Sequence, residues 1–185
     1  MDFATSRFAE NGYHPTSVAE IVTGLGVGKG VFYWYFQSKE ELFLEILREA
    51  QTDLRRAQKQ AITDIDDPVR RIELGTRATM AWSANHRDVY ELTQFAATEA
   101  RFAPALRKGQ EIAIKDTITH VREGVQRGLL RDIDPEYIAQ SMVGVTGQLV
   151  RTFIHERGTD PNEVADAAIA FILEGILVGD RAPVV

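Results

Sequence analysis

The chain has 185 residues, of which 44% are hydrophobic, so it is long enough to bury a substantial core in one or two domains. Its 21 Lys and Arg residues against 27 Asp and Glu give a net charge of −6, which argues against indiscriminate coating of nucleic acid but leaves room for a local basic patch. Cysteine is absent, which excludes disulfides, a thiol nucleophile and a Cys-based zinc site. The sequence contains neither a membrane-length apolar run nor a signal peptide, so we expect a cytoplasmic protein with no membrane partner.

Apolar residues recur at helical spacing along almost the whole chain, and glycine or proline separates the apolar segments. Few stretches have the alternation of a strand, so we predict an all-α protein. The predicted helices cover residues 1–11, 18–23, 28–35, 39–62, 68–85, 88–99, 104–129, 135–157 and 161–178.

Polar residues mark several helix starts. Ser17 with Glu20, and Ser38 with Glu41, have the spacing of a capping box, in which a hydroxyl accepts an early backbone N–H. An aspartate followed by proline opens three further helices, because the carboxylate caps free N–H groups and proline presets the backbone angle. These Asp-Pro pairs occupy residues 67–68, 134–135 and 160–161.

Residues 16–42 combine a short helix, a tight turn at residues 24–27, a second short helix and the capped start of a longer helix. The second short helix, residues 28–35, carries lysine, glycine and tyrosine together, a mixture that a buried core would not favour. In a helix-turn-helix the first helix lies across the DNA backbone and the second enters the major groove. The segment therefore predicts a protein that binds double-stranded DNA.

Four residues of this segment suit contact with DNA phosphates. Ser17 offers a hydroxyl at a helix N-terminus, where anions are attracted. Tyr33 and Tyr35 offer phenol hydroxyls, and Lys39 follows in the first turn of the next helix.

Three consecutive residues near the start of the second helix suit closer contact with the bases. Lys29, at the leading end, fits guanine acceptors or phosphate, and Val31 fits a thymine methyl group. Gly30 lets the backbone approach the duplex closely.

The aromatic residues of this helix also have a packing interpretation. Phe32 and Phe36, four residues apart, are expected in the core. Because Tyr33, Trp34 and Tyr35 are consecutive, we expect one or two of them to face the core as well.

The N-terminal quarter of the chain, residues 3–47, resembles the TetR family of bacterial repressors. The matching motifs are Glu10-Asn11-Gly12-Tyr13, Thr16-Ser17-Val18, Glu20-Ile21, Gly26-Val27-Gly28-Lys29-Gly30, Phe32-Tyr33-Trp34-Tyr35-Phe36 and Ser38-Lys39-Glu40. The resemblance implies a three-helix helix-turn-helix DNA-binding domain over residues 1–47 and a helical effector-binding and dimerisation domain over residues 48–185. It also implies a homodimeric repressor that a small molecule releases from a palindromic operator, with no catalytic residues, cofactor or metal.

Two features depart from the family pattern. Gly28 stands where the family commonly has Ser or Thr, so the second helix lacks a side-chain cap. The family usually carries a basic segment before the first helix, whereas this sequence opens on Met1-Asp2, so either the protein is short here or its start is truncated. Residues 1–47 carry only Arg7, Lys29 and Lys39 against six acidic residues, so we expect few phosphate contacts and a modest salt dependence.

The last two predicted helices are candidates for the dimer interface. The helix over 135–157 has an apolar seam and two glycines, Gly144 and Gly147, that would suit close backbone packing. The final helix is apolar nearly all round, which is typical of burial on more than one side. The alternative is an ordinary core within one chain. The predicted dimerisation residues are Met142, Val145, Leu149, Phe153, Ala168 and Ile172.

The middle helices contain aromatic residues with polar neighbours, as many small-molecule pockets do. They favour an apolar or amphipathic effector, although an ordinary core has the same composition. The predicted effector-binding residues are Trp82, His86, Phe95, Phe102 and His120.

Two other function classes compete with a regulator. An enzyme is disfavoured because the four histidines are scattered without metal-ligand spacing and no nucleophile elbow or phosphate-binding loop occurs. The acidic residues at 64–67 lack the glycine and terminal glutamate of a calcium loop and are better explained as a solvated turn. A helical module that only binds a ligand would explain residues 48–185 but not the segment 29–35.

Overall fold

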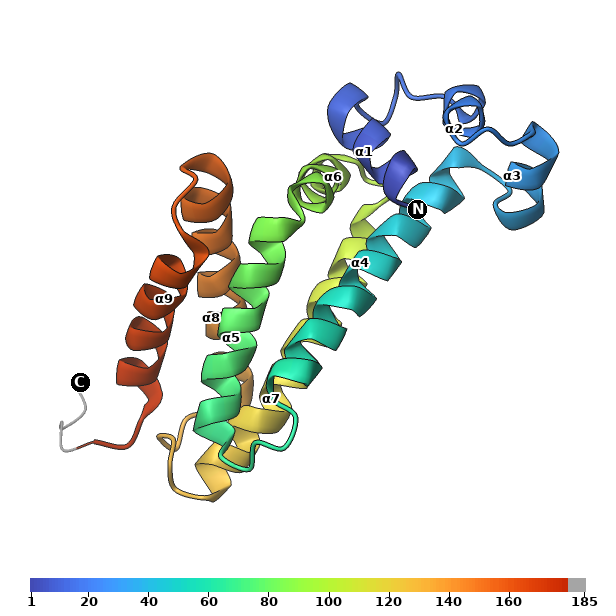
Figure 1. Cartoon of the computed structure of the whole chain (residues 1–185). Coiled ribbons are helices and arrows are strands. Elements are labelled where there is room, and N and C mark those ends of the chain that lie inside the picture. Colours follow the sequence, from blue (N-terminus) through green and yellow to red (C-terminus); the bar gives the residue numbers. More distant parts are fainter. Residues whose placement is uncertain (180–185) are drawn as a thin grey trace. The chain divides into compact units, whose positions relative to one another are not determined.

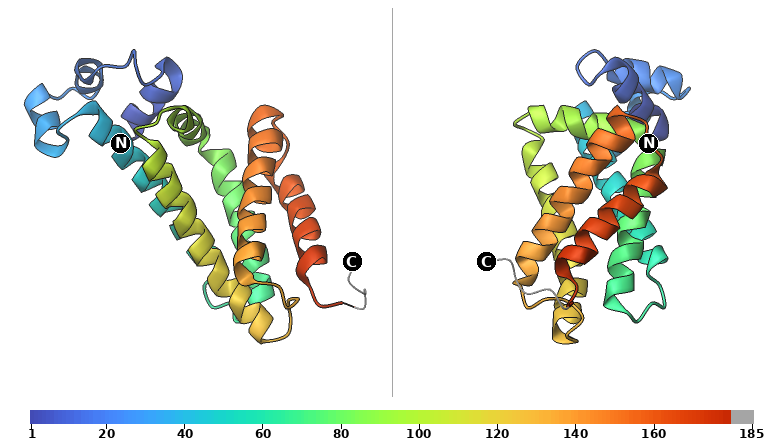
Figure 2. Two further views of the ribbon diagram at one scale, coloured as in Figure 1. Left: turned by 180° about the vertical axis from the view of Figure 1, so that it is seen from behind. Right: turned by 90° about the vertical axis from the view of Figure 1, so that its left-hand side faces the viewer.

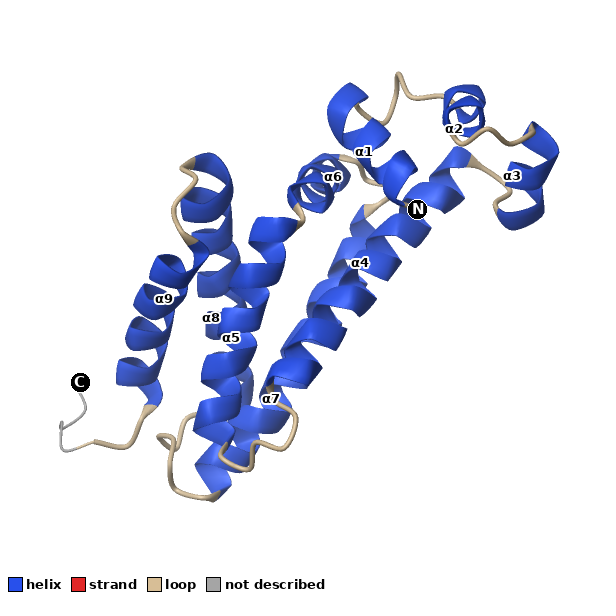
Figure 3. Cartoon of the chain, viewed as in Figure 1, coloured by secondary structure: helices blue, strands red, loops and turns tan. Residues whose placement is uncertain are grey.

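The computed structural model describes residues 1–179, and these divide into two compact units. Unit 1 combines residues 1–54 with 86–110, and unit 2 combines 55–85 with the chain from 111 onward. Among the described residues every regular element is helical, so the all-α prediction is confirmed (Figures 1 and 3). The unit boundaries differ from the predicted domain boundary at residue 47, because a second, distant stretch of chain packs into unit 1.

Unit 1 contains four helices outright, α1 (Asp2–Asn11), α2 (Val18–Gly24), α3 (Lys29–Tyr35) and α6 (Arg87–Thr98). Unit 2 contains α5 (Pro68–Asn85), α8 (Pro135–Leu149), the π-helical segment η1 (Val150–Glu156) and α9 (Pro161–Ile176). Two long helices belong to both units, α4 (Lys39–Ala61) and α7 (Ala103–Gln126). The predicted helix 135–157 is thus α8 followed by a π-helical turn, and the other predicted boundaries agree within a few residues.

The helix starts follow the predicted capping chemistry. The hydroxyl of Ser17 accepts the backbone N–H of Glu20 at 3.1 Å, and that of Ser38 accepts the N–H of Glu41 at the same distance. In a capping box the Glu41 carboxylate would accept the backbone N–H of the N-cap residue, Ser38. Here it accepts the N–H of the preceding residue, Gln37, instead. The three Asp-Pro starts are confirmed, with the carboxylates of Asp67, Asp134 and Asp160 accepting from the N–H groups of Val69, Glu136 and Asn162.

The core of unit 1 is aromatic. Phe43 of α4 and Phe102, just before α7, are completely buried, and their ring centroids lie 4.5 Å apart. Phe95 of α6 stacks on Tyr13 with centroids 5.4 Å apart. Segments distant in the sequence therefore share one apolar cluster, which explains why residues 86–110 belong to the same compact unit as the N-terminal helices.

Unit 2 is a helical bundle in which α5 and α8 both pack against α9. Figure 2 shows α8 in orange and α9 in red running next to each other. Met142 on α8 and Ala168 and Ile172 on α9 are buried in the core of this unit. The prediction that these three residues form a dimer interface is therefore wrong, since their side chains already have partners within the chain.

Candidate nucleic-acid interface

Helices α2 and α3 are joined by a tight turn over residues 25–28. The N–H of Val27 donates to the carbonyl of Val22 at 3.0 Å, and Gly26 adopts a positive φ of 67°, which glycine tolerates. Gly28 occupies the N-cap of α3 in an extended conformation with no side-chain hydrogen bond. The turn fixes the two helices as a helix-turn-helix pair.

One face of this pair is firmly anchored in unit 1. Ile21 and Val22 of α2 are buried, and Phe32 of α3 is only 6% exposed. Phe36, just beyond α3, packs against the same cluster, as predicted. A seven-residue helix held by so few inward side chains leaves the remainder of its surface outward.

The outer surface of α3 is unusually aromatic. Tyr33, Trp34 and Tyr35 are 56%, 86% and 72% exposed. The prediction that one or two of these residues face the core is wrong, because Phe32 and Phe36 alone supply the inward contacts of this segment. Large exposed apolar groups gathered on one short helix indicate a surface that another molecule covers.

The start of α3 is also open. Lys29 and Val31 are exposed, and a Cβ added to Gly30 would meet no atom within 4 Å. Among residues 1–179, no side chain or backbone atom occupies the space beside the Gly30 backbone. The exposed residues of α3, from Lys29 to Tyr35, are called the reading face below.

Ser17 and Lys39, the two predicted phosphate contacts outside α3, differ in their exposure. Ser17 is exposed at the N-terminus of α2, where its hydroxyl accepts the N–H of Glu20. Lys39, in contrast, is half-buried and donates to backbone carbonyls of unit 1, which leaves its predicted phosphate contact without support in this structure.

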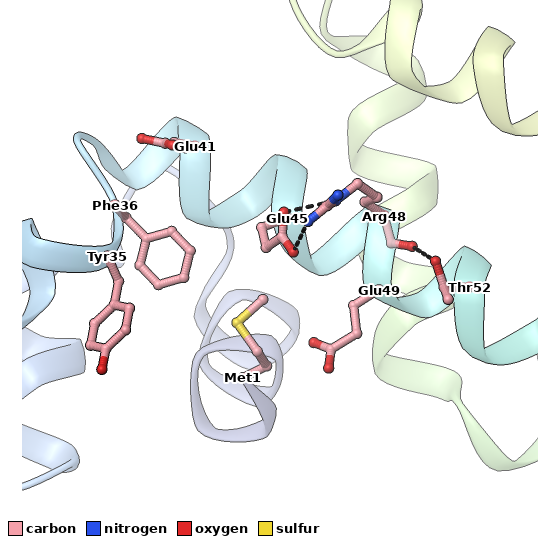
Figure 4. A pocket seen from close by; sticks show the side chains of 8 residues that line it. All are labelled: Met1, Tyr35, Phe36, Glu41, Glu45, Arg48, Glu49 and Thr52. Carbon is pink, nitrogen blue, oxygen red and sulfur yellow. Dashed lines mark hydrogen bonds and ion pairs between the residues drawn. The ribbon is translucent and has the colours of Figure 1, made fainter.

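Acidic residues limit where phosphates could approach unit 1. Glu41, Glu45 and Glu49 follow one another along α4 and line a groove of about 650 Å³. Figure 4 shows them together with Tyr35 and Phe36, which form the apolar side of this groove. Arg48 also lines the groove and pairs with Glu45, but the three carboxylates outnumber its guanidinium. Because carboxylates repel phosphate, the reading face is the better candidate for contact with the DNA backbone.

The predicted effector-binding residues do not form one cluster. Phe95 and Phe102 belong to the aromatic core of unit 1, so for these two the ordinary-core interpretation holds. His86 is the N-cap of α6 in unit 1. Trp82 and His120 belong to unit 2.

His120 lies in a charged cluster of unit 2. Its Nδ1 is 3.3 Å from Nη1 of Arg71, and the same nitrogen of Arg71 lies 2.9 Å from the carboxylate of Glu123. Burial, and then the neighbouring Arg71 charge, lower the pKa of His120 below its ordinary value. The lowered pKa favours the neutral imidazole, and because a guanidinium can only donate, Nδ1 of His120 is the acceptor in its contact with Arg71.

Sequence reasoning missed the outward position of Trp34 and the part that Arg71 plays beside His120. The first was detectable in principle, because Phe32 and Phe36 already account for the inward face of so short a helix. The second had no sequence signal, since Arg71 and His120 are 49 residues apart.

These features define a helix-turn-helix DNA-binding protein. Residues 1–46 match the family described as "Bacterial regulatory proteins, tetR family". The chain is 25% identical over 180 residues to the HTH-type transcriptional regulator YdgC of Bacillus subtilis (strain 168), covering 94% of this chain and 89% of that protein. It is also 25% identical over 181 residues to the HTH-type transcriptional repressor KstR2 of Mycobacterium tuberculosis, covering 95% and 90%.

Among solved structures, the fatty acid degradation regulator FadR from Bacillus halodurans has the same fold, with a TM-score of 0.84 at 18% identity over 94% of this chain and 92% of that one. Its N-terminal segment therefore matches the TetR family, and over most of its length the chain is similar to transcriptional regulators. Of the helices described here, none is long and apolar enough to cross a membrane.

Proposed function

We propose that this protein is a homodimeric, ligand-responsive repressor that binds a palindromic DNA operator and is released by a small apolar or amphipathic effector in the cytoplasm. The observation that carries the proposal is the reading face: Lys29, Tyr33, Trp34 and Tyr35 project outward while Phe32 fixes the same helix to the core. Such a helix fits the major groove, where side chains at its leading end meet base edges.

The residues of the reading face divide by chemistry. Lys29, at the leading end, is the candidate for a contact with guanine or with phosphate, and Val31 is the candidate for an apolar base contact. Tyr33 and Tyr35 can donate phenol hydroxyls to phosphates, and Trp34 can add its indole N–H or an apolar contact. Ser17 at the start of α2 supplies a further phosphate contact.

A second copy of the chain would supply the two-fold symmetry of a palindrome. The outward surface of α8 and α9 suits this partner, because it exposes two large aromatic residues, Tyr137 at 70% and Phe171 at 69%. A Cβ added at Gly144, Gly147 or Gly175 would meet no atom within 4 Å, so another backbone has room to approach there. Three half-buried residues would lie at the edge of this interface and add apolar contacts to it: Val145, Leu149 and Phe153.

The effector site is assigned to unit 2. His120 and Trp82 belong to this unit, and so does Gly75 of α5, where an added Cβ meets nothing within 4 Å although the residue is partly buried. The names of two similar proteins, a fatty acid degradation regulator and a ketosteroid transcriptional regulator, favour an apolar or amphipathic effector.

Release would follow from a population shift. An effector lowers DNA affinity only if it prefers the conformation that binds DNA poorly. Helices α4 and α7 each continue from unit 1 into unit 2, so a change around an effector has two continuous routes to the reading face.

Footprinting on the DNA that flanks the protein's own gene tests the regulator function. A protected palindrome is expected, and gel shift with hits from a thermal-shift metabolite screen should then identify a compound that removes the protection. Absence of any protected sequence, or an operator affinity that no stabilising compound changes, would contradict the corresponding part of the proposal.

A further inference from the structure

The Lys39 ammonium group at the start of α4 is held by three backbone carbonyls. It donates to the oxygen of Tyr13 at 2.6 Å, to that of Thr16 at 2.8 Å and to that of His14 at 3.2 Å. An ammonium group has three N–H donors, so all of them are used inside unit 1. The same nitrogen lies 4.3 Å from the centroid of the Tyr13 ring, a cation–π distance.

The three carbonyls belong to the loop between α1 and α2, residues 12–17. Thr16 is completely buried in this loop, and its hydroxyl donates to the carbonyl of Gly12 at 2.8 Å. The next residue, Ser17, is the N-cap of α2. The ammonium of Lys39 therefore ties the start of α4 directly to the residues that set where α2 begins.

The chemistry of the contact is specific for lysine. A compact ammonium can donate in three directions to converging carbonyls, whereas a guanidinium is planar and donates in a fixed fork. Burial, and then the charge of Arg101, lower the pKa of Lys39 below its ordinary value, as expected for a cation withdrawn from water. A DNA phosphate could bind this group only by displacing a carbonyl.

We propose that Lys39 is a positioning residue for operator binding, which holds the α1–α2 loop and hence Ser17 and α2 in place without contacting the DNA itself. This inference rests on the proposed DNA-binding function and replaces the phosphate contact predicted for Lys39 from the sequence. It distinguishes Lys39 from Lys29, which is exposed on the reading face.

Two substitutions separate the two roles. A lysine that contacts phosphate is replaced well by arginine, whereas the three-carbonyl site does not fit a guanidinium. We therefore expect Lys39→Arg and Lys39→Gln both to weaken binding to the footprinted duplex by about 10- to 100-fold, the effect of losing hydrogen bonds to a charged group. The slope of log affinity against log salt concentration should stay at the wild-type value. Lys29→Gln is the matched control and should reduce that slope by about 1 per subunit.

Hydrogen exchange of the free protein supplies a readout that does not depend on DNA. In both Lys39 variants the amides of residues 17–25 should exchange faster, while those of α8 and α9 stay at wild-type rates. A merely structural loss of stability would instead accelerate exchange throughout the chain. Affinities are measured at a temperature where circular dichroism shows each variant folded, and Lys39→Arg decides the question if Lys39→Gln does not fold.

Wild-type affinity in Lys39→Arg, or a salt slope reduced by about 1 per subunit in Lys39→Gln, would show that Lys39 is a phosphate ligand and would overturn the inference. Unchanged exchange at residues 17–25 in both variants would also overturn it. Failure of the wild-type chain to protect any duplex would instead contradict the proposed function. The exchange measurement would still test whether Lys39 holds the α1–α2 loop and α2 in place.

Discussion

Phe32 and Trp34, two residues apart on α3, have opposite surroundings: the first is 6% exposed and the second 86%. The phenyl ring of Phe32 anchors the helix in the core of unit 1, so the indole of Trp34 is presented outward on a rigid support. Because the inward side of α3 is packed into the core, the exposed side chains of this helix lose little conformational entropy when they bind another molecule.

Truncation of Trp34 should therefore affect DNA binding, whereas truncation of Phe32 should affect folding stability. Trp34→Ala is expected to weaken operator binding by at least about tenfold, in line with removal of an exposed aromatic contact, and to leave the melting temperature almost unchanged. Phe32→Ala should cost about 3–5 kcal/mol of folding free energy. Fluorescence anisotropy and urea unfolding measure the two effects. Wild-type DNA affinity in Trp34→Ala would remove this residue from the reading face.

The exposed aromatic ring of Phe171 on α9 gives a test of dimerisation. Phe171→Glu should shift the protein from dimer to monomer, because it places a charge in an apolar contact, without unfolding a chain in which this side chain is already exposed. Phe171→Leu is the matched control and should remain dimeric. Analytical ultracentrifugation measures the change, and a Phe171→Glu dimer of wild-type affinity would place the interface elsewhere.

Phe102 is a core residue in the structure, although its sequence context suggested an effector pocket. Because it is completely buried against Phe43, Phe102→Ala should destabilise the protein by about 3–5 kcal/mol. Chemical unfolding with and without an identified effector separates the two roles. A variant of wild-type stability that no longer responds to effector would restore the pocket assignment.

The burial of His120 predicts a pH dependence of stability. Its pKa is lower in the folded chain than the ordinary value, so between the two values the unfolded chain binds more protons. Stability should therefore fall as pH decreases through about 6.5 towards the folded-state pKa. Glu123 and Asp116 oppose this shift, whereas Arg71 strengthens it.

Urea unfolding at pH 8, 7, 6 and 5 checks this dependence in the wild-type chain and in His120→Gln. The variant should lose part of the decline between pH 7 and 5, because an amide has no proton to gain in that range. Identical pH profiles for both proteins would show that His120 does not contribute to the dependence.

Local chemistry was enough to predict most of the fold. The Asp-Pro pairs and the Ser17 and Ser38 caps lie where helices begin, because each depends only on residues within one turn. The π-helical turn after α8 was not predicted, since a helical pattern of apolar residues continues through it.

Features that depend on distant residues were less accessible. The periodicity of α8 and α9 shows that these helices have apolar faces, but it does not show which residues contact the same chain. The sequence therefore predicts Met142 at a dimer interface, whereas the structure buries it within unit 2. Likewise, Lys39 is an ordinary exposed cation by its spacing, and only the folded loop brings three carbonyls around it.

The shared aromatic cluster of unit 1 limits how this regulator can be re-engineered. Chimeric repressors are assembled by joining the DNA-reading segment of one protein to the sensing segment of another. A junction placed after residue 54 would separate Phe43 from Phe95 and Phe102, its ring partners. The portable module is the discontinuous pair of segments 1–54 and 86–110, and a working graft has to exchange both together.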